Sequence, residues 1–237
     1  MDLFRTLLLA GFLALTCPVY ATPWTNWTSA TAGANGGGAA NGSLGGVTVS
    51  YQGELDSFVT NGTSTIWSPN SSFIGGSVTS APSAVGDDLR LNGSSTGINT
   101  ILFGSAVVNP LIAFWSLGGP GGSASFTFLD GLTPIVQAGG PNSISGGSSI
   151  TALGSVVTGV DGNGVVQFMG TFNKIEFTST FEDFYAFTVG VSDSAVPEPA
   201  LMALVAAGLA FVALRIKRGS QRSRDYRHAR ACATQRD

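Results

Sequence analysis

The sequence predicts an all-β protein whose main domain is an antiparallel β-sandwich of jelly-roll-like topology. Short apolar runs of strand length recur through the middle of the chain, and Gly-rich turns separate them. No stretch between residues 47 and 194 has the 3.6-residue apolar period of a helix. The 237 residues show no internal repeat, so we do not expect a solenoid or a propeller.

The N-terminus has the three parts of a secretory signal peptide. Arg5 supplies a positive charge, an apolar run follows at 7–15, and the triplet ending at Ala21 resembles the small-x-small site that signal peptidase reads. We therefore expect residues 1–21 to be removed by signal peptidase. An uncleaved anchor helix is disfavoured, because the apolar run is much shorter than the ~20 residues that span a bilayer. Attachment of a lipid to Cys17 is a further alternative.

Residues 22–46 are rich in Gly, Ala, Asn, Ser and Thr. A Gly-rich segment loses much backbone entropy on ordering and offers little apolar area in return. We expect a loop or a loosely held edge here, although the segment contains Trp24 and Trp27.

The β-sandwich domain is expected at 47–194. Strands are predicted where β-branched and aromatic residues gather in short runs, at 47–51, 99–104, 110–117, 123–129, 164–170, 174–180 and 185–192. In the last run every second residue from Tyr185 to Val191 is large and apolar, which indicates a strand with one buried face. The Asp-Gly-Asn-Gly sequence at 161–164 predicts a hairpin turn.

The segment from 22 to 194 is acidic. Its two basic residues are Arg90 and Lys174, and its ten acidic residues are Glu54, Asp56, Asp87, Asp88, Asp130, Asp161, Glu176, Glu182, Asp183 and Asp193. Such an excess of negative charge repels nucleic acid and anionic lipid, so we expect neither as a partner of the domain.

The same segment lacks the residue types that several enzyme classes need. Cys17 and Cys232 lie near the two ends of the chain, and the single histidine, His228, lies in the C-terminal tail. We therefore expect no disulfide, no Cys-based metal site and no His-dependent hydrolase in the domain. No cofactor, metal ion or catalytic residue is predicted.

Paired carboxylates are the catalytic chemistry that remains, since glycoside hydrolysis needs only two. The pairs are Glu54/Asp56, Asp87/Asp88 and Glu182/Asp183. Adjacent residues of a strand point to opposite faces, so Asp87 and Asp88 would have to lie in a loop to act together. For all three pairs we favour solvated surface charges. A carboxylate-dependent glycan-active enzyme is the alternative to a non-enzymatic protein.

Two tryptophans are candidates for stacking on sugar rings. Trp115 lies within the apolar run 110–117, so we assign it to the core. Trp67 stands beside Ser-Pro-Asn and is the better candidate for an exposed ligand-binding residue.

The chain changes character at residue 195. A Pro-Glu-Pro triplet precedes an apolar stretch at 200–214, which the basic residues Arg215, Lys217 and Arg218 follow. A helix of ~15–17 residues reaches about 22–26 Å, a marginal span of a ~30 Å hydrocarbon core that snorkelling by the basic flank can complete. We expect one transmembrane helix within 195–218 and a disordered cytoplasmic tail at 219–237, with the domain outside. A buried core helix is disfavoured.

This order of parts resembles the PEP-CTERM sorting signal of Gram-negative bacteria, with Val196, Pro197, Glu198 and Pro199 at its start. The resemblance implies processing by an exosortase, a membrane enzyme that recognises the triplet, and a link to exopolysaccharide and biofilm production. The same signal is also labelled the C-terminal domain of ice-binding proteins. This chain departs from the pattern in its long tail. Parts of the central region also resemble exported β-rich domains that carry this signal, at 99–118, 123–136 and 162–178.

We therefore expect an exported, non-enzymatic protein that is anchored by its C-terminal helix until it is processed. It then resides at the cell surface or in the extracellular matrix, where polysaccharide is the expected ligand. An ice-binding protein is a further alternative, although no spaced Thr-x-Thr ladder occurs in the sequence.

Overall fold

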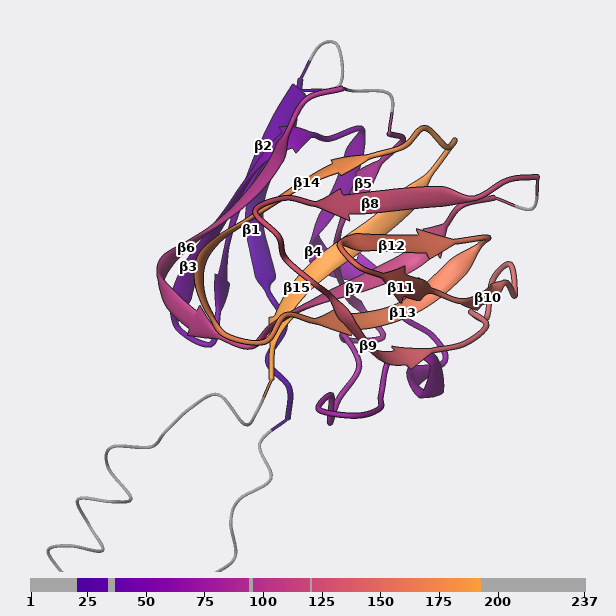
Figure 1. The fold of residues 1–237 in the computed structure, drawn as a ribbon. Helices are drawn as coiled ribbons and strands as arrows, with labels where there is room; N and C mark the ends of the chain where they lie inside the picture. Colours follow the sequence, from indigo (N-terminus) through magenta and orange to yellow (C-terminus); the bar gives the residue numbers. More distant parts are fainter. Residues whose placement is uncertain (1–20, 34–36, 94–95, 120, 193–237) are drawn as a thin grey trace, which may run out of the picture. The chain divides into compact units, whose positions relative to one another are not determined.

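The computed structural model describes residues 21–33, 37–93, 96–119 and 121–192, and they form two facing β-sheets (Figure 1). The strands are β1 (Asn26–Ala32), β2 (Gly37–Leu44), β3 (Val47–Glu54), β4 (Ser57–Ser64), β5 (Gly86–Leu91), β6 (Asn99–Val108), β7 (Pro110–Leu117), β8 (Ala124–Phe128), β9 (Ile135–Gly139), β10 (Ser148–Ser149), β11 (Thr151–Leu153), β12 (Val156–Gly159), β13 (Gly162–Gln167), β14 (Thr171–Ser179) and β15 (Tyr185–Val191). Within this described part there is no α-helix, only a 3₁₀ turn at Asn70–Ser72. The all-β prediction is confirmed.

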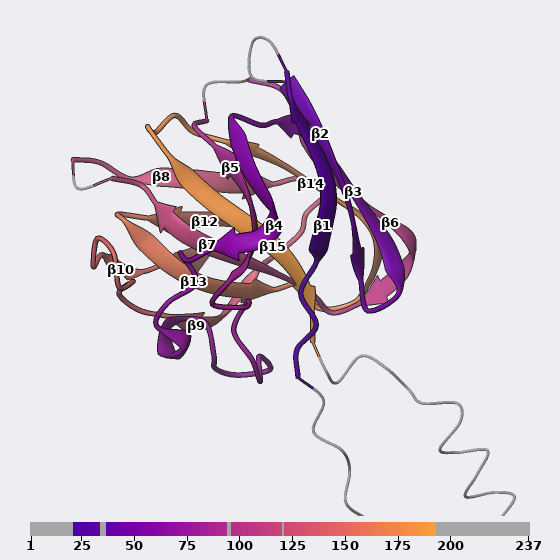
Figure 2. The ribbon, with the colours of Figure 1, turned by 180° about the vertical axis from the view of Figure 1, so that it is seen from behind.

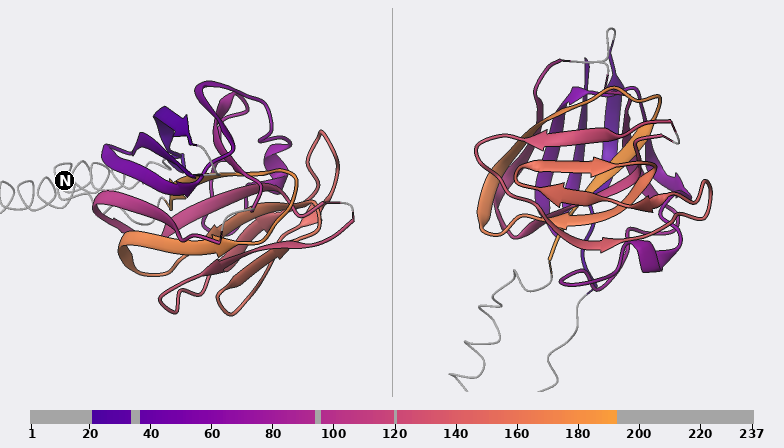
Figure 3. Two further views of the ribbon diagram at one scale, coloured as in Figure 1. Left: turned by 90° about the horizontal axis from the view of Figure 1, so that it is seen from above. Right: turned by 45° about the vertical axis from the view of Figure 1, so that its right-hand side comes forward.

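The eight-stranded sheet has the order β1-β2-β3-β6-β14-β8-β12-β11, and the seven-stranded sheet has the order β10-β13-β7-β15-β5-β4 with β9 beside β13. Figures 2 and 3 show the two layers from behind and from above. Four antiparallel pairs are nested within them: β5 with β15, β6 with β14, β7 with β13, and β8 with β12. Successive nested pairs belong alternately to the seven-stranded and the eight-stranded sheet, which is the strand pairing of a jelly roll, so the jelly-roll prediction is confirmed.

The expected loop at 22–46 is instead part of the eight-stranded sheet. β1 pairs with β2 and β2 pairs with β3 along its whole length, so the Gly-rich backbone is held by ladder hydrogen bonds. Trp27 is fully buried, and its ring nitrogen donates to the Thr188 hydroxyl at 3.3 Å. The loop prediction was wrong because composition shows neither the pairing of β1, β2 and β3 with one another nor the contact of Trp27 with the distant Thr188; the edge alternative fits β1, which is an edge strand of this sheet.

All seven predicted runs overlap strands, and 110–117 coincides with β7. The run at 164–170 was set too far along the chain, since β13 ends at Gln167. The strands that prediction missed include β4 and β5, whose sequences carry Asn, Gly and Asp. Pairing with an existing sheet makes such residues extend, whatever their local preference.

Aromatic residues fill the space between the sheets. The Phe126 ring stacks on that of Phe177 at 4.7 Å and meets those of Phe114 and Tyr185 edge-on at 4.8 and 5.4 Å. Edge-to-face and offset contacts of this kind stabilise a core beyond the area that they bury.

The seven-stranded sheet is also covered on its outer face. A second apolar cluster there includes Trp67, Phe73 and Val78 from the β4–β5 connection, which lie over Trp115 and Ala186 of the sheet. As a result every residue of β15 is buried, so the prediction of a single buried face was too narrow. The core assignment of Trp115 is confirmed, since it is 7% exposed.

The Asp-Gly-Asn-Gly sequence at 161–164 does not form a hairpin turn. It joins β12 to β13, which belong to different sheets, and its last three residues lie inside β13. A Cβ at Gly162 would approach the Cα of Gly159 to 2.7 Å, so this glycine permits the close crossing between the sheets.

Several expectations concern residues outside the described part. These are the signal peptide up to residue 20, the end of the domain at 193–194, the sorting signal and helix at 195–218, and the tail at 219–237. Among the described residues, no helix has the length and apolar character to cross a membrane. Ala21, the expected cleavage position, is described and is exposed.

Candidate functional site

Four connections of the jelly roll meet at one end of the sandwich. Because β15 is antiparallel to both β5 and β7, and β13 is antiparallel to β7, the ends of β5 and β7 lie beside the starts of β13 and β15. The described parts of four connections therefore share this end, at 92–93 with 96–98, at 118–119 with 121–123, at 160–161 and at 180–184, and the last three connections lie on the right of Figure 1. We call it the four-loop end.

Hydrogen bonds between backbone and side chains tie these connections together. The Glu182 N–H donates to the carbonyl of Asn92 at 2.7 Å, and the Gly118 N–H donates to Glu182 Oε2 at 3.1 Å. The Asp161 N–H donates to the Gly118 carbonyl at 2.6 Å. Gly118 has φ +77°, and a Cβ there would lie 2.3 Å from the carbonyl oxygen of Gly159. Glycine is thus required where the β7–β8 connection passes the β12–β13 connection.

A cleft of about 490 Å³ opens at this end, a size typical of small-ligand sites. Its walls come from the end of β7 and from the β7–β8 and β14–β15 connections, and they consist of Ser116, Gly119, Gly121, Gly122, Ser123, Phe181, Glu182, Asp183 and Phe184. Phe181 is 67% exposed, whereas Phe184 is half-buried. Trp115 meets the Phe184 ring edge-on at 5.6 Å, and the Arg90 guanidinium lies 5.2 Å from its centroid. The cleft therefore has one fixed and one exposed aromatic ring.

Glu182 is the distinctive ionisable group of the cleft. Burial raises its pKa from the ordinary 4.5 to about 7, and the nearby carboxylates Asp183 and Asp161 act in the same direction. Hydrogen bonds from the Gly118 and Phe184 N–H groups favour the charged form and oppose the rise. A carboxyl group with such a pKa can exchange a proton near neutral pH.

A network of polar residues supports the floor of the cleft. Asp161 Oδ1 accepts hydrogen bonds from the hydroxyls of Ser116 and Ser145 at 2.6 and 3.1 Å. Asn163 Oδ1 accepts from the Ser116 N–H at 2.9 Å and from the Asn142 side chain at 3.2 Å. These hydrogen bonds fix the orientation of Ser116, which lines the cleft. Asp161 and Asn163 therefore have a structural role.

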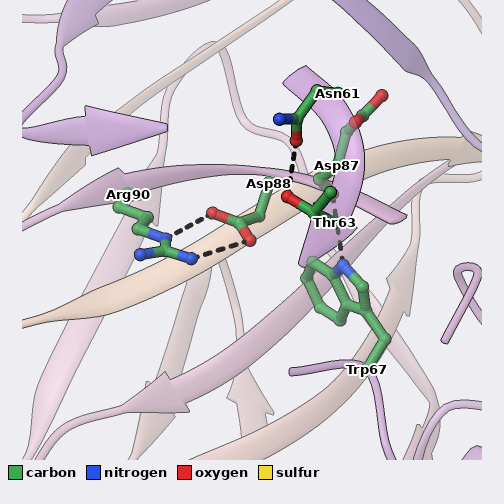
Figure 4. A network of polar contacts seen from close by, with 6 residues as sticks. All are labelled: Asn61, Thr63, Trp67, Asp87, Asp88 and Arg90. Carbon is green, nitrogen blue, oxygen red and sulfur yellow. Dashed lines mark hydrogen bonds and ion pairs between the residues drawn. The ribbon is translucent and has the colours of Figure 1, made fainter. Parts of the chain in front are cut away.

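The Asp87/Asp88 pair is buried within β5, where its two carboxylates point to opposite sides of the strand (Figure 4). Asp88 is fully buried and accepts two hydrogen bonds from Arg90, at 2.5 and 3.3 Å. The Asp87 carboxylate accepts from the N–H groups of Trp27 and Gly62 at 2.9 and 2.8 Å. The surface-charge prediction was wrong for this pair, and the opposite-face prediction is confirmed.

The Glu54/Asp56 pair differs from Asp87/Asp88, and the surface-charge prediction was wrong for Glu54 and is confirmed for Asp56. Glu54 is 2% exposed whereas Asp56 is exposed. Beneath Glu54, the Tyr51 hydroxyl donates to the Glu54 carbonyl and to Asn99 Oδ1. Burial, and then the charge of Glu54, raise the pKa of Tyr51. These hydrogen bonds hold the C-terminal end of β3 in place.

Trp67 is fully buried, so the prediction that it is an exposed sugar-binding residue was wrong. Its ring nitrogen donates to the Asp87 carbonyl at 3.1 Å (Figure 4). The Phe73 ring packs edge-on against the Trp67 ring at 5.4 Å. The exposed aromatic residue at a cleft is instead Phe181, which sequence reasoning missed. Its position next to Glu182 and Asp183, in a segment without strand alternation, was the available signal.

Within the described ranges, no group of His, Cys, Asp and Glu side chains has an arrangement that could hold a metal ion. The residues assigned to the sorting signal (Val196, Pro197, Glu198 and Pro199) and its basic flank (Arg215, Lys217 and Arg218) lie outside those ranges. Among the described residues, β15 starts at the four-loop end and finishes with Val191 at the opposite end of the domain.

Comparisons of the chain with curated proteins and with solved structures found no match. The family model for the PEP-CTERM protein-sorting motif matches residues 195–218, the segment that the sequence analysis delimited. The chain is therefore a protein that carries a PEP-CTERM sorting motif.

Proposed function

We propose that this chain is an exported, non-enzymatic protein that an exosortase processes at its C-terminus and that acts on polysaccharide in the extracellular matrix of a Gram-negative bacterium. The observation that carries the proposal is the sorting motif at 195–218. Such a motif suggests export, transient anchoring at the membrane by the apolar segment, and recognition of the Pro-Glu-Pro triplet by the exosortase.

The folded domain supports a binding role. Its one end carries a cleft with an exposed aromatic ring, carboxylates and Gly-rich walls, and sugars are bound through their apolar faces and hydroxyl groups by such combinations. The segment 22–194 contains no His or Cys, the commonest residues of hydrolytic sites. Binding without turnover is the simplest use of this cleft.

Replacing residues 197–199 by alanine tests the sorting part of the proposal. We expect the variant to stay in the membrane fraction at full length, whereas the wild-type protein loses its C-terminal segment. Intact mass spectrometry of fractionated cells, with and without the host exosortase, measures this. A variant with alanine at 219–221 is the matched control and should be processed. An identical mature C-terminus in all strains would refute exosortase processing.

Polysaccharide binding is tested with the full-length protein in detergent against a broad glycan panel. We expect retention on at least one neutral or basic polysaccharide and none on strongly anionic ones, because the domain is acidic. If the protein binds no member of the panel, polysaccharide binding is refuted and the proposed sorting by an exosortase is unaffected.

A carboxylate-dependent glycan-active enzyme is the second candidate, and one observation favours it. Glu182 has a pKa of about 7 and lies beside Asp183 in the cleft, as a general acid would. This function requires release of reducing ends from a polysaccharide by the wild-type protein, and loss of that activity in Glu182→Gln. A wild-type protein that is inert across the same panel would eliminate it.

A further inference from the structure

The segment Phe181–Phe184 places an apolar ring and two carboxylates side by side. Phe181 is 67% exposed and lines the cleft together with Glu182 and Asp183. Since the three residues are consecutive, a ligand small enough to enter a cleft of about 490 Å³ can meet the ring and a carboxylate at once. The flat face of a sugar ring suits the phenyl ring, and the carboxylates require a donor or a cation.

The negative charge of the cleft has no cation available to balance it among the described residues. The Arg90 guanidinium lies 5.2 Å from the centroid of the Phe184 ring, which lines the cleft. Its Nε and Nη2 groups, however, donate hydrogen bonds to the Asp88 carboxylate. Lys174, the other base, lies 2.7 Å from Glu176 Oε2 and is 3.9 Å from Asp130. Asp161 adds a further negative charge beneath Ser116. A ligand that brings its own positive charge would complete the site electrostatically.

We propose that the cleft at the four-loop end binds amino-sugar units that carry a free ammonium group, with the sugar face on Phe181 and the ammonium at the carboxylates of Glu182 and Asp183. This assignment rests on the proposed polysaccharide-binding function and names the class of polysaccharide. One amino sugar presents an apolar C–H face and an ammonium group on the same ring, so it can meet both the Phe181 ring and the carboxylates that line the cleft. A lysine side chain offers the ammonium at the end of a thin stem and leaves most of the Phe181 ring uncovered.

The test compares two oligosaccharides that differ only in the amine. Glucosamine oligomers and their N-acetylated counterparts are titrated calorimetrically into the full-length protein in detergent. We expect the free-amine oligomer to bind at least about tenfold more tightly, and its affinity to fall as salt is raised, since the contact is between opposite charges near solvent.

Equal or tighter binding of the acetylated oligomer would overturn the assignment and leave polysaccharide binding itself intact. Oligolysine of the same length is the third ligand. If it binds as tightly as the free-amine sugar, the site recognises cations rather than amino sugars, and the proposal is also wrong. Failure of every glycan would instead remove the proposed function on which the assignment rests.

Variants locate the binding in the cleft. Phe181→Ala removes the exposed ring and should weaken binding of the free-amine oligomer by about three- to tenfold. Asp183→Asn removes an exposed charge and should weaken it by about two- to fivefold. Both side chains are at the surface, so circular dichroism should show an unchanged fold.

The matched controls lie away from the cleft, at the ends of their strands opposite the four loops. Leu153→Ala removes an apolar side chain that is 86% exposed on β11. Asp130→Asn removes an exposed carboxylate that follows β8. Neither should change the affinity. Binding that tolerates both cleft variants, or that the controls weaken equally, would show that the ligand lies elsewhere.

Discussion

Glu182 is the residue whose chemistry depends most on its surroundings. It is half-buried, it is hydrogen-bonded to two other connections of the four-loop end through Asn92 and Gly118, and its pKa is raised to about 7 chiefly by burial. In the unfolded chain the same carboxyl ionises at its ordinary pKa of 4.5. Between these values the folded protein holds a proton that the unfolded chain has released. The free energy of unfolding therefore falls as the pH rises from 4.5 to about 7, and this contribution is constant above that.

Glu182→Gln should remove this pH dependence. The amide keeps an acceptor for the Gly118 N–H but does not ionise, so the variant should gain stability relative to wild type as the pH rises. After allowance for solvent screening of a half-buried group, we expect the gain between pH ~4.5 and ~8 to be about 1 kcal/mol. Urea denaturation of both proteins at the two pH values measures it.

Asp130→Asn is the matched control for the loss of one negative charge at a distant exposed position. If both variants show the same change with pH, net charge and not the environment of Glu182 is responsible. A difference between Glu182→Gln and wild type that stays constant with pH would contradict the raised pKa.

Among the elements, β1 best shows how distant contacts decide the state of a weakly apolar segment. Its single large buried side chain, Trp27, belongs to the main core cluster together with Phe187 of β15, and its ring nitrogen donates to Thr188. The Trp27 backbone N–H donates to the Asp87 carboxylate of β5. Just before it, Thr25 bonds to Val189, and the Val191 N–H donates to the Pro23 carbonyl. The N-terminal segment thus holds the last strand of the domain.

Trp27→Ala should destabilise the protein by about 3–5 kcal/mol, the usual cost of removing a fully buried aromatic side chain. Urea denaturation measures the loss. Ser29→Ala, at an exposed position of the same strand, is the control and should change the stability by less than about 0.5 kcal/mol. A small effect of Trp27→Ala would mean that residues 22–46 are loosely held after all.

For the whole molecule, the nested pairing places the cleft and the last described strand residue at opposite ends of the domain. The cleft lies at the end where β15 begins, and β15 finishes with Val191 at the other end. The seven residues of this strand span about 20 Å at ~3.4 Å each. Ligand binding and processing of the C-terminus should therefore be independent.

Ending the chain at residue 194 should leave the affinity for the best glycan within about twofold of that of the full-length protein, because the described residues that line the cleft lie between 116 and 184. Calorimetry with both proteins is the measurement, and circular dichroism of the shorter chain is the control for folding. A tenfold loss in a folded, shortened protein would show that the C-terminal segment takes part in binding.

The sequence by itself determined the all-β class, seven of the strands and the sorting motif. Each is a local pattern: period-2 or continuous apolar runs extend a strand, and the triplet, apolar stretch and basic cluster follow one another without interruption. It also identified Glu182 and Asp183 as a pair, without indicating that a cleft forms beside them.

Only the tertiary structure decided which polar and aromatic residues are buried. Trp67 was predicted to be exposed, but it packs in one cluster with Trp115 and Ala186 from distant strands, which no local window shows. Asp88 and the Gly-rich strand β2 have partners nearby in the sequence, Arg90 and β3, but composition did not reveal that these pairs form. The four-loop end is likewise absent from any local window, since its loops are up to ninety residues apart and are brought together by nested strand pairs. Burial and proximity are properties of those long-range pairs, and so the site became visible only in the fold.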